Sequence, residues 1–119
     1  MKDFGDLKAW EKAHRLALST YRETSSFPDG EKYGLTSQMR RAAVSIAANI
    51  AEGCGRGTDA DFARFLQMAL GSAAELEYLV ALARDLSLVG LEASSRLRGQ
   101  VVEVKKMLTS LCQKLKAER

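Results

Sequence analysis

The sequence predicts an all-α protein, folded as an antiparallel up-down-up-down four-helix bundle with coiled-coil-like packing. Alanine and leucine, both strong helix formers, occur 17 and 16 times, whereas proline occurs once, at Pro28. Apolar residues recur at helical spacing in four successive segments, and glycine-containing breaks separate these segments. The last segment repeats its apolar residues every 3.5 positions on average, which is typical of left-handed coiled coils.

Length and charge set the broad class. The chain has 119 residues and a mass of 13.0 kDa, so we expect a single domain over residues 1–119 with one hydrophobic core. Its net charge of +3 is compatible with a nucleic-acid or acidic partner and does not require one. Residues 1–6 have no apolar core, and no apolar run approaches the roughly 20 residues that span a bilayer. We therefore expect a cytoplasmic protein with no signal peptide and no membrane contact.

The first helix is expected to run from Asp6 or Leu7 to about Thr24. Its predicted core face is a row of apolar and aromatic residues at spacings of three and four, namely Leu7, Trp10, His14, Ala17, Leu18 and Tyr21. The segment Pro28-Asp29-Gly30 is expected to separate this helix from the next.

The second helix, expected from Leu35 to Gly53, is apolar on almost every side. One side carries Leu35, Met39, Ala42, Ile46 and Ile50, and the opposite side carries Val44, Ala47, Ala48 and Ala51. A helix that is apolar all round is usually buried, so the polar residues Arg41, Ser45, Asn49 and Glu52 are expected to have partners in the protein interior. We expect Gly53 to end this helix in the left-handed conformation.

The third helix is expected from Asp59 to about Leu88, with Thr58 and Asp61 forming a capping pattern at its start. It carries one apolar row of Phe62, Leu66, Ala69, Ala73, Leu76, Val80 and Ala83, and a second row of Phe65, Met68, Leu79, Leu82 and Leu86. The fourth helix follows Gly90 and carries the 3.5-residue repeat, made of Leu97, Val101, Val104, Leu108, Leu111 and Leu115. A short loop joins the second and third helices, so they are expected to pair as a hairpin that brings Arg41 to Glu75 as an ion pair.

The apolar surface of the second and third helices exceeds what one copy of a four-helix bundle needs. Excess apolar surface usually marks an interface, so we expect a homo-oligomer. The alternative is a monomer in which the second helix is simply central.

The sequence shows no pattern that indicates a catalytic or metal site. Glu11 and His14 have the spacing found in bridged metal centres, but this pair occurs once and His14 is the only histidine. Cys112 lies in an apolar repeat and is expected in the core, whereas Cys54 lies in a glycine-rich loop and is expected to be an exposed thiol. The Gly53–Gly57 loop, with Arg56, resembles an anion-binding helix start but lacks the lysine and spacing of a phosphate-binding loop. We predict no catalytic residue, no metal and no cofactor, and hence a protein that is not an enzyme.

One polar pattern suggests a function. Lys8, Lys12, Arg15 and Arg22 form a basic stripe on the first helix, and Lys32, Arg40 and Arg56 would extend it if the fold brings them close. Such a stripe can follow a phosphate backbone without reading bases, so we predict salt-sensitive RNA or DNA binding. Changing Lys12 and Arg15 together to Glu is expected to weaken this binding. The alternative is an ordinary solvated helix face, because Glu11 and Glu23 lie nearby.

Several segments, taken in order, match a known family. They are Phe4 and Leu7 with Trp10; Phe27-Pro28 with Glu31 and Tyr33-Gly34-Leu35; Gln38 with Arg40-Arg41-Ala42; Ser45-Ile46 with Asn49-Ile50-Ala51-Glu52-Gly53; and Phe62, Phe65-Leu66, Ala69, Gly71-Ser72 and Glu75-Leu76. Nearly the whole chain thereby resembles the bacterial four-helix bundle proteins encoded in intervening sequences of large-subunit ribosomal RNA genes. The resemblance implies a four-helix bundle and, in relatives, a five-fold ring. It also implies similarity to the accessory variability proteins of diversity-generating retroelements, which form basic rings that bind a reverse transcriptase and nucleic acid. It carries over no catalytic residues.

Three interpretations follow. The first is an oligomeric scaffold, a pentameric ring by the resemblance, that binds RNA, DNA or a nucleic-acid-handling protein through basic faces. The second is a protein-only assembly or adaptor module without a nucleic-acid ligand. The third is an enzyme with an unrecognised site. The polar family positions Arg41, Ser45, Asn49, Glu52, Gly53 and Glu75 are expected to be structural in each case.

Overall fold

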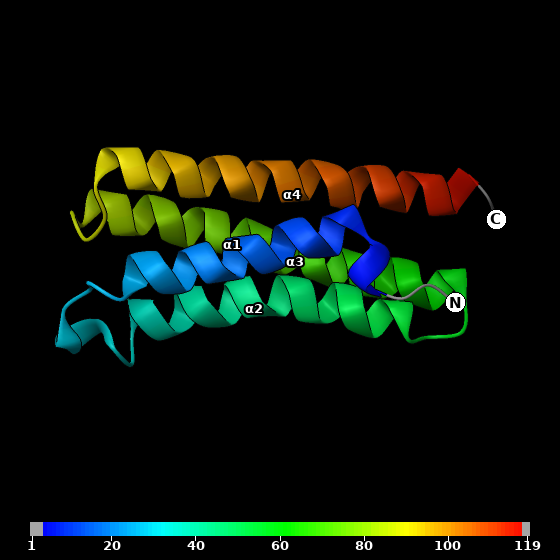
Figure 1. The fold of residues 1–119 in the computed structure, drawn as a ribbon, viewed down its shortest axis with the longest axis horizontal. Coiled ribbons are helices and arrows are strands. Elements are labelled where there is room, and N and C mark those ends of the chain that lie inside the picture. Colours follow the sequence, from blue (N-terminus) through cyan, green and yellow to red (C-terminus); the bar gives the residue numbers. More distant parts are fainter. Residues whose placement is uncertain (1–3, 118–119) are drawn as a thin grey trace.

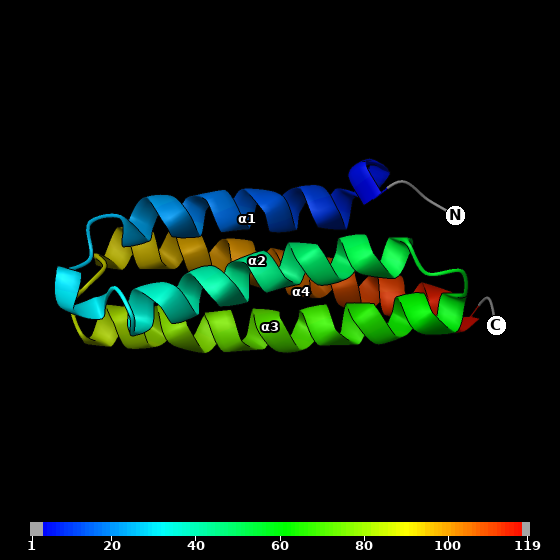
Figure 2. The same ribbon diagram turned by 90° about the horizontal axis from the view of Figure 1, so that it is seen from below.

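The computed structural model describes residues 4–117 and consists of four α-helices that alternate in direction (Figures 1 and 2). These are α1 (Lys8–Thr24), α2 (Leu35–Cys54), α3 (Asp59–Asp85) and α4 (Leu91–Ala117), with short 3-10 helices η1 (Phe4–Asp6) and η2 (Asp29–Glu31). The bundle measures 46 × 22 × 20 Å. The expectations made for residues 1–3 and 118–119, including part of the predicted domain and of the segment tested for a signal peptide, lie outside the described range.

Each helix packs against its neighbours in sequence, and α1 also packs against α4 to close the bundle. No contact joins α1 to α3 or α2 to α4 within residues 4–117, so these pairs lie diagonally across the core. This arrangement confirms the predicted all-α up-down-up-down bundle. The α2–α3 connection, the start of α1 and the end of α4 lie at the same end of the molecule (Figure 2).

The core forms where the sequence predicted it in α3 and α4. The first apolar row of α3 is buried from Leu66 to Ala83, and Phe62 before it is half-buried. The heptad row of α4 is buried except for Leu111, which is half-buried. These two helices therefore pack through the 3.5- and 3.6-residue periods that their sequences contain.

Helix α3 begins and ends by identifiable local contacts. Thr58 caps it, because the Thr58 hydroxyl accepts a hydrogen bond of 3.1 Å from the backbone N–H of Asp61. The helix ends at Asp85, three residues before the predicted Leu88. Ser87 adopts the left-handed conformation with φ 62°, and the backbone N–H of Leu88 bonds to the carbonyl of Ala83 at 2.9 Å. This pairing is the Schellman motif, here with serine where glycine is usual.

The predicted role of Gly53 was wrong. No glycine among residues 4–117 has a positive φ, and α2 continues through Gly53 to Cys54. A Cβ atom on Gly53 would lie 2.9 Å from Phe62 Cδ1 and 2.9 Å from Phe65 Cβ. Glycine is therefore needed because α2 and α3 approach closely at their hairpin, not because the backbone turns there.

The predicted core face of α1 was also wrong. Of its apolar and aromatic row only Ala17 is buried, while Leu18 and Tyr21 are 49% and 45% exposed. The face that packs inward carries Ala9, Ala13, Leu16, Ala17, Thr20 and Thr24. The buried Thr20 hydroxyl donates to the Leu16 carbonyl at 2.8 Å, so its burial leaves no unsatisfied donor. Small residues on this face let α1 approach the bundle closely, and the larger aromatic row remains outside.

The prediction that helix α2 is buried all round was wrong as well. Its core side is buried, but Val44 is 43% exposed and Ala48, Arg41 and Glu52 are also exposed. On α3 the second apolar row divides: Phe65 and Leu79 are buried and Leu82 is half-buried, whereas Met68 and Leu86 are exposed. The surplus apolar surface is therefore concentrated on α1 and α2, with a smaller share on α3.

Within the described residues one helix, α3, is long and apolar enough to cross a membrane by length and composition. Its most apolar window has a mean hydropathy of 1.2, whereas no apolar run long enough to span a bilayer is expected from the sequence. Helix α3 packs against α2 and α4 in the bundle, and core helices pass the same test. Its composition reflects an apolar outer side in addition to its buried side.

Candidate functional site

An apolar depression lies on the surface between α1 and α2. This α1–α2 groove has a volume of about 560 Å³ and is lined by Phe4, Trp10, His14, Ala17, Leu18, Tyr21, Val44, Ala47, Ala48 and Ala51. Alanines of α2 form its floor, and larger side chains of η1 and α1 form its wall. The row that the sequence assigned to the core is thus the wall of an open groove.

The wall of the groove is organised by ring contacts. The Trp10 and His14 rings stack with centroids 5.1 Å apart and an interplanar angle of 4°. Phe4 packs edge-on against Trp10 at 4.8 Å. These ring contacts order the wall of the groove.

Arg40, one of the predicted nucleic-acid contacts, instead joins α1 to α2 beside the groove. Its Nε donates to the Thr24 hydroxyl at 2.9 Å, and its Nη2 donates to the Tyr21 carbonyl at 3.4 Å. Its guanidinium also lies 4.5 Å from the centre of the Tyr21 ring. These three interactions give Arg40 a structural role.

The polar family positions occupy two different environments. Ser45 on α2 and Ser72 on α3 are hydrogen-bonded at 2.9 Å, and the Asn49 side chain donates to the Ser45 carbonyl at 2.9 Å. The three residues are half-buried; the Ser45–Ser72 bond joins α2 to α3, whereas the Asn49 bond stays within α2. Glu52, however, is exposed and pairs locally with Arg56 at 2.8 Å.

The predicted Arg41–Glu75 ion pair was wrong. Both residues are exposed, and no ion pair joins either one to another side chain within residues 4–117. Burial had been the reason to expect partners for Arg41, Glu52 and Glu75. They lie outside because α2 and α3 direct only one side each toward the core.

The basic stripe of α1 is a real surface feature, but part of its charge is neutralised. Lys12 pairs with Glu103 of α4 at 3.6 Å, and Arg15 pairs with Glu11 at 3.0 Å. No ion pair involves Lys8 or Arg22 in the part of the chain that the structure describes, and both are exposed. Lys8 and Arg22 are therefore the most available cations of the stripe.

Arg40 and Arg56 do not join this stripe, since both belong to the α2 side of the bundle. Arg56 pairs with Glu52 and its guanidinium lies 4.8 Å from the centre of the Phe65 ring. Arg96 of α4 instead lies with Arg22 in a groove of about 680 Å³ between α1 and α4, but it is paired there with Glu23 at 3.4 Å. Sequence reasoning missed Arg96 because only tertiary packing brings α4 beside α1.

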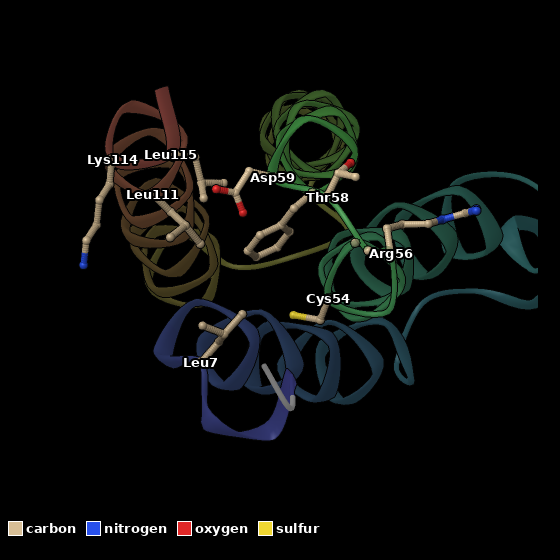
Figure 3. A pocket seen from close by; sticks show the side chains of 11 residues that line it. Leu7, Cys54, Arg56, Thr58, Asp59, Leu111, Lys114 and Leu115 are labelled. Carbon is tan, nitrogen blue, oxygen red and sulfur yellow. The ribbon is translucent and has the colours of Figure 1, made fainter. Parts of the chain in front are cut away.

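A cavity of about 400 Å³ lies at the end of the bundle beside the α2–α3 loop (Figure 3). Leu7, Cys54 and Leu111 point into it, whereas the Arg56 and Lys114 side chains point away (Figure 3). The likeness of this loop to an anion-binding helix start is not supported by the geometry. Asp59 places a carboxylate at the cavity, whereas the charged ends of Arg56 and Lys114, which also line it, point away.

Cys54 does not match its predicted environment, whereas Cys112 packs against the core, partly as predicted. Cys54 is buried rather than exposed, because the last turn of α2 contains it. Cys112 is half-buried, and burial raises the pKa of its thiol despite a 3.7 Å hydrogen bond from the Gln67 amide. No group of three or more His, Cys, Asp and Glu side chains gathers as a metal site within the described residues.

One ionic cluster links α3 to α4. Glu77 Oε1 accepts a hydrogen bond of 2.8 Å from Lys105 Nζ. Arg98 Nε lies 3.6 Å from Glu77 Oε2 and forms an ion pair with it. The Lys105 hydrogen bond lowers the pKa of Glu77, burial partly opposes this effect, and the charges of Lys105 and Arg98 lower it further.

A pH dependence of stability follows from this cluster. Because the folded-state pKa of Glu77 is lowered, its carboxylate stabilises the fold at neutral pH, and this contribution is lost as the pH falls through that pKa. Glu77→Gln is expected to lower the free energy of unfolding at pH 7, and the difference from wild type should vanish in acid. Urea unfolding from pH 7 to pH 3 measures this. Glu103→Gln, at a more exposed pair, is the control and should change little. An equal deficit for Glu77→Gln at both pH values would contradict the assignment.

The chain matches a known protein family along most of its length. The family model described as 23S rRNA-intervening sequence protein matches residues 5–110. The chain belongs to this family. The match includes α1, α2, α3 and most of α4, so the resemblance inferred from separate segments is confirmed over nearly the whole fold.

A solved structure from Bacteroides thetaiotaomicron VPI-5482 is similar to this member of the 23S rRNA-intervening sequence protein family. It is described as a protein with unknown function from the S23 ribosomal protein family. The two share 25% sequence identity with a TM-score of 0.79, covering 87% of this chain and 97% of that chain. No curated protein matches the chain significantly. Family and relative therefore agree on the fold, and neither description states a reaction.

Proposed function

We propose that this protein is a non-enzymatic helical scaffold that assembles with copies of itself, as a ring of five by the family resemblance. The observation that carries the proposal is the α1–α2 groove, which leaves Leu18, Tyr21 and Val44 between 43% and 49% exposed on one face. Contiguous apolar surface of this kind is costly in water and is typical of interfaces. An assembly would cover it. We place this scaffold in the cytoplasm, without a catalytic residue, metal or cofactor.

Light scattering coupled to size-exclusion chromatography tests the assembly. The expected mass is a multiple of the 13.0 kDa of one chain, and about five times that value for a five-membered ring. The mass should hold on dilution across the micromolar range if the interface is extensive. A mass of 13.0 kDa at every concentration would overturn the proposal.

We further propose that the assembled scaffold binds RNA or DNA through the α1 stripe. Lys8 and Arg22 support this because no ion pair within residues 4–117 neutralises them, whereas Arg96 beside Arg22 is paired with Glu23 at 3.4 Å. Assembly would repeat the stripe in every copy, so modest contacts to phosphates would add. A protein-only adaptor is the alternative outcome.

The stripe gives a specific prediction for nucleic-acid binding. Lys8→Glu combined with Arg22→Glu should weaken binding to a labelled RNA or DNA strand more than the Lys12→Glu, Arg15→Glu pair, whose wild-type cations already have carboxylate partners. Losing two phosphate contacts should reduce the slope of log affinity against log salt by about 2. Fluorescence anisotropy over a salt series measures both quantities.

The control carries the same charge change on another face. Lys106→Glu with Lys116→Glu changes two exposed lysines of α4 that no ion pair involves within residues 4–117, and it should leave affinity closer to wild type. Equal losses in both double variants would indicate net charge rather than the stripe. No binding by wild-type protein at low salt would favour the protein-only adaptor.

A further inference from the structure

A row of exposed residues follows the outer side of α3, opposite its buried face. It consists of Met68, Gly71, Glu75 and Tyr78, at intervals of three, four and three, and we name it the α3 ridge. Met68 and Tyr78 are 47% and 63% exposed. Such large apolar side chains on either side of a carboxylate form a surface that suits a complementary partner.

A second exposed row follows the outer side of α2. It consists of Arg41, Val44 and Ala48, at intervals of three and four, and we name it the α2 row. Val44 and Ala48 belong to the α1–α2 groove, and Arg41 lies one turn beyond Val44. The row therefore combines a small apolar floor with one cation at its end.

The two rows match in height along the bundle. The hydrogen bond between Ser45 and Ser72 sets the register of the antiparallel helices α2 and α3. Arg41 lies four residues before Ser45 and Glu75 lies three residues after Ser72, so these opposite charges stand at nearly the same level.

The remaining members of the rows pair in the same way. By the same register Val44 stands level with Gly71, and Ala48 stands level with Met68. Val44 and Met68 thus each stand level with a small residue of the other row. Both rows are exposed, and no ion pair joins Arg41 to Glu75 within residues 4–117.

A second copy of the chain can bring the two rows into contact. Rotation about an axis parallel to the helices keeps every residue at its own height, so the α3 ridge of one copy can meet the α2 row of the next in register. We propose, building on the self-assembly proposed above, that the α1–α2 groove of each copy receives the α3 ridge of a neighbour. In this contact Arg41 pairs with Glu75 of the partner subunit.

The contact has the features expected of a specific interface. Met68 of the partner subunit packs on the alanine floor, and Leu18 and Tyr21 close over it from α1. The Arg41–Glu75 pair fixes the register, since any axial shift would leave both charges unpaired beside apolar surface. The two surfaces differ, so each copy uses its groove toward one neighbour and its ridge toward the other. Head-to-tail contacts of this kind close into a ring when the rotation between neighbouring copies divides a full turn.

A mixing experiment tests the two surfaces. The groove variant carries Leu18→Glu and Val44→Glu, and the ridge variant carries Met68→Glu and Tyr78→Glu. Each alone should be monomeric by light scattering, because every contact in it contains a damaged surface. Mixed in equal amounts, they should form a heterodimer, since the intact ridge of one fits the intact groove of the other while the doubly damaged contact repels. Lys106→Glu, an exposed charge change on α4, is the control and should keep the wild-type mass.

A charge exchange tests the register independently. Arg41→Glu and Glu75→Arg alone should each weaken assembly by about tenfold or more, and the two changes combined in one chain should restore most of it. Sedimentation over a concentration series measures these dissociation constants. All substituted positions are exposed, so circular dichroism should show wild-type helix content. If the groove or ridge variants lose helix content, the charge-exchange variants alone test whether the groove and the ridge of neighbouring copies are in contact.

The outcomes separate this inference from the proposed function. If wild-type protein assembles but the ridge variant keeps its mass, the ridge is not the contact, and the scaffold remains. Absence of a heterodimer on mixing would likewise overturn the head-to-tail contact, as would failure of the double charge exchange to recover assembly. A wild-type monomer at all concentrations would overturn both.

Discussion

Leu76→Ala is expected to lower the free energy of unfolding by about 2–5 kcal/mol, the range for removing a buried leucine side chain and leaving a cavity. Leu76 is fully buried in the middle of α3, among residues of the core that all four helices share. Small domains have a total stability of about 5–15 kcal/mol, so this loss is a large share of the whole. Urea unfolding followed by circular dichroism measures it.

The same chain provides a matched control for this change. Leu91→Ala removes the same atoms from a largely exposed site at the start of α4, and the expected change lies within about 0.5 kcal/mol. Both variants should be measured at one protein concentration, because self-association stabilises the folded state by mass action. Similar losses at the two positions would contradict the core described for α3.

Gly53→Ala is expected to destabilise the protein by about 1–3 kcal/mol, the range for overpacking a close contact. The added methyl group would lie 2.9 Å from both Phe62 Cδ1 and Phe65 Cβ, and Phe65 is buried, so the α2–α3 hairpin must open slightly to accept it. This outcome is opposite to the gain that alanine usually brings in a helix.

Gly99→Ala is the control for the glycine change. Gly99 lies inside α4, and an added methyl group there would have nothing within 4 Å, so alanine should stabilise the protein by about 0.5–1 kcal/mol. Thermal unfolding of the two variants should therefore shift in opposite directions. A stabilised Gly53→Ala variant would show that the α2–α3 hairpin can accept the added methyl group, which would contradict the close contact at Gly53.

The two surfaces of α1 show where sequence reasoning reached its limit. Its helical extent was predicted correctly, since it depends on local spacing and on the break near Pro28. Its inward face was not, because α1 carries one row of small residues and one of larger apolar residues. Hydrophobicity favours burying the larger row, but the face that packs inward carries mostly alanine and threonine, with Leu16 as its one large apolar residue.

Gly53 and Arg41 illustrate the same limit for single residues. A glycine near a predicted helix end fits a left-handed cap or a close approach equally well, and only the positions of Phe62 and Phe65 distinguish them. Arg41 was correctly placed level with Glu75, since antiparallel pairing determines height. The direction of each side chain around its helix depends on the rotation of that helix in the bundle, which sequence spacing does not specify.

The sequence by itself determined the all-α class, the helix order, the Thr58 cap and the core rows of α3 and α4, because these follow from local propensity and periodicity. Only the tertiary structure decided which face of α1 is inside, where apolar surface stays in contact with water, and which cations lack carboxylate neighbours. These properties depend on contacts between residues far apart in the chain. The groove and the stripe are therefore tertiary features built from locally predictable helices.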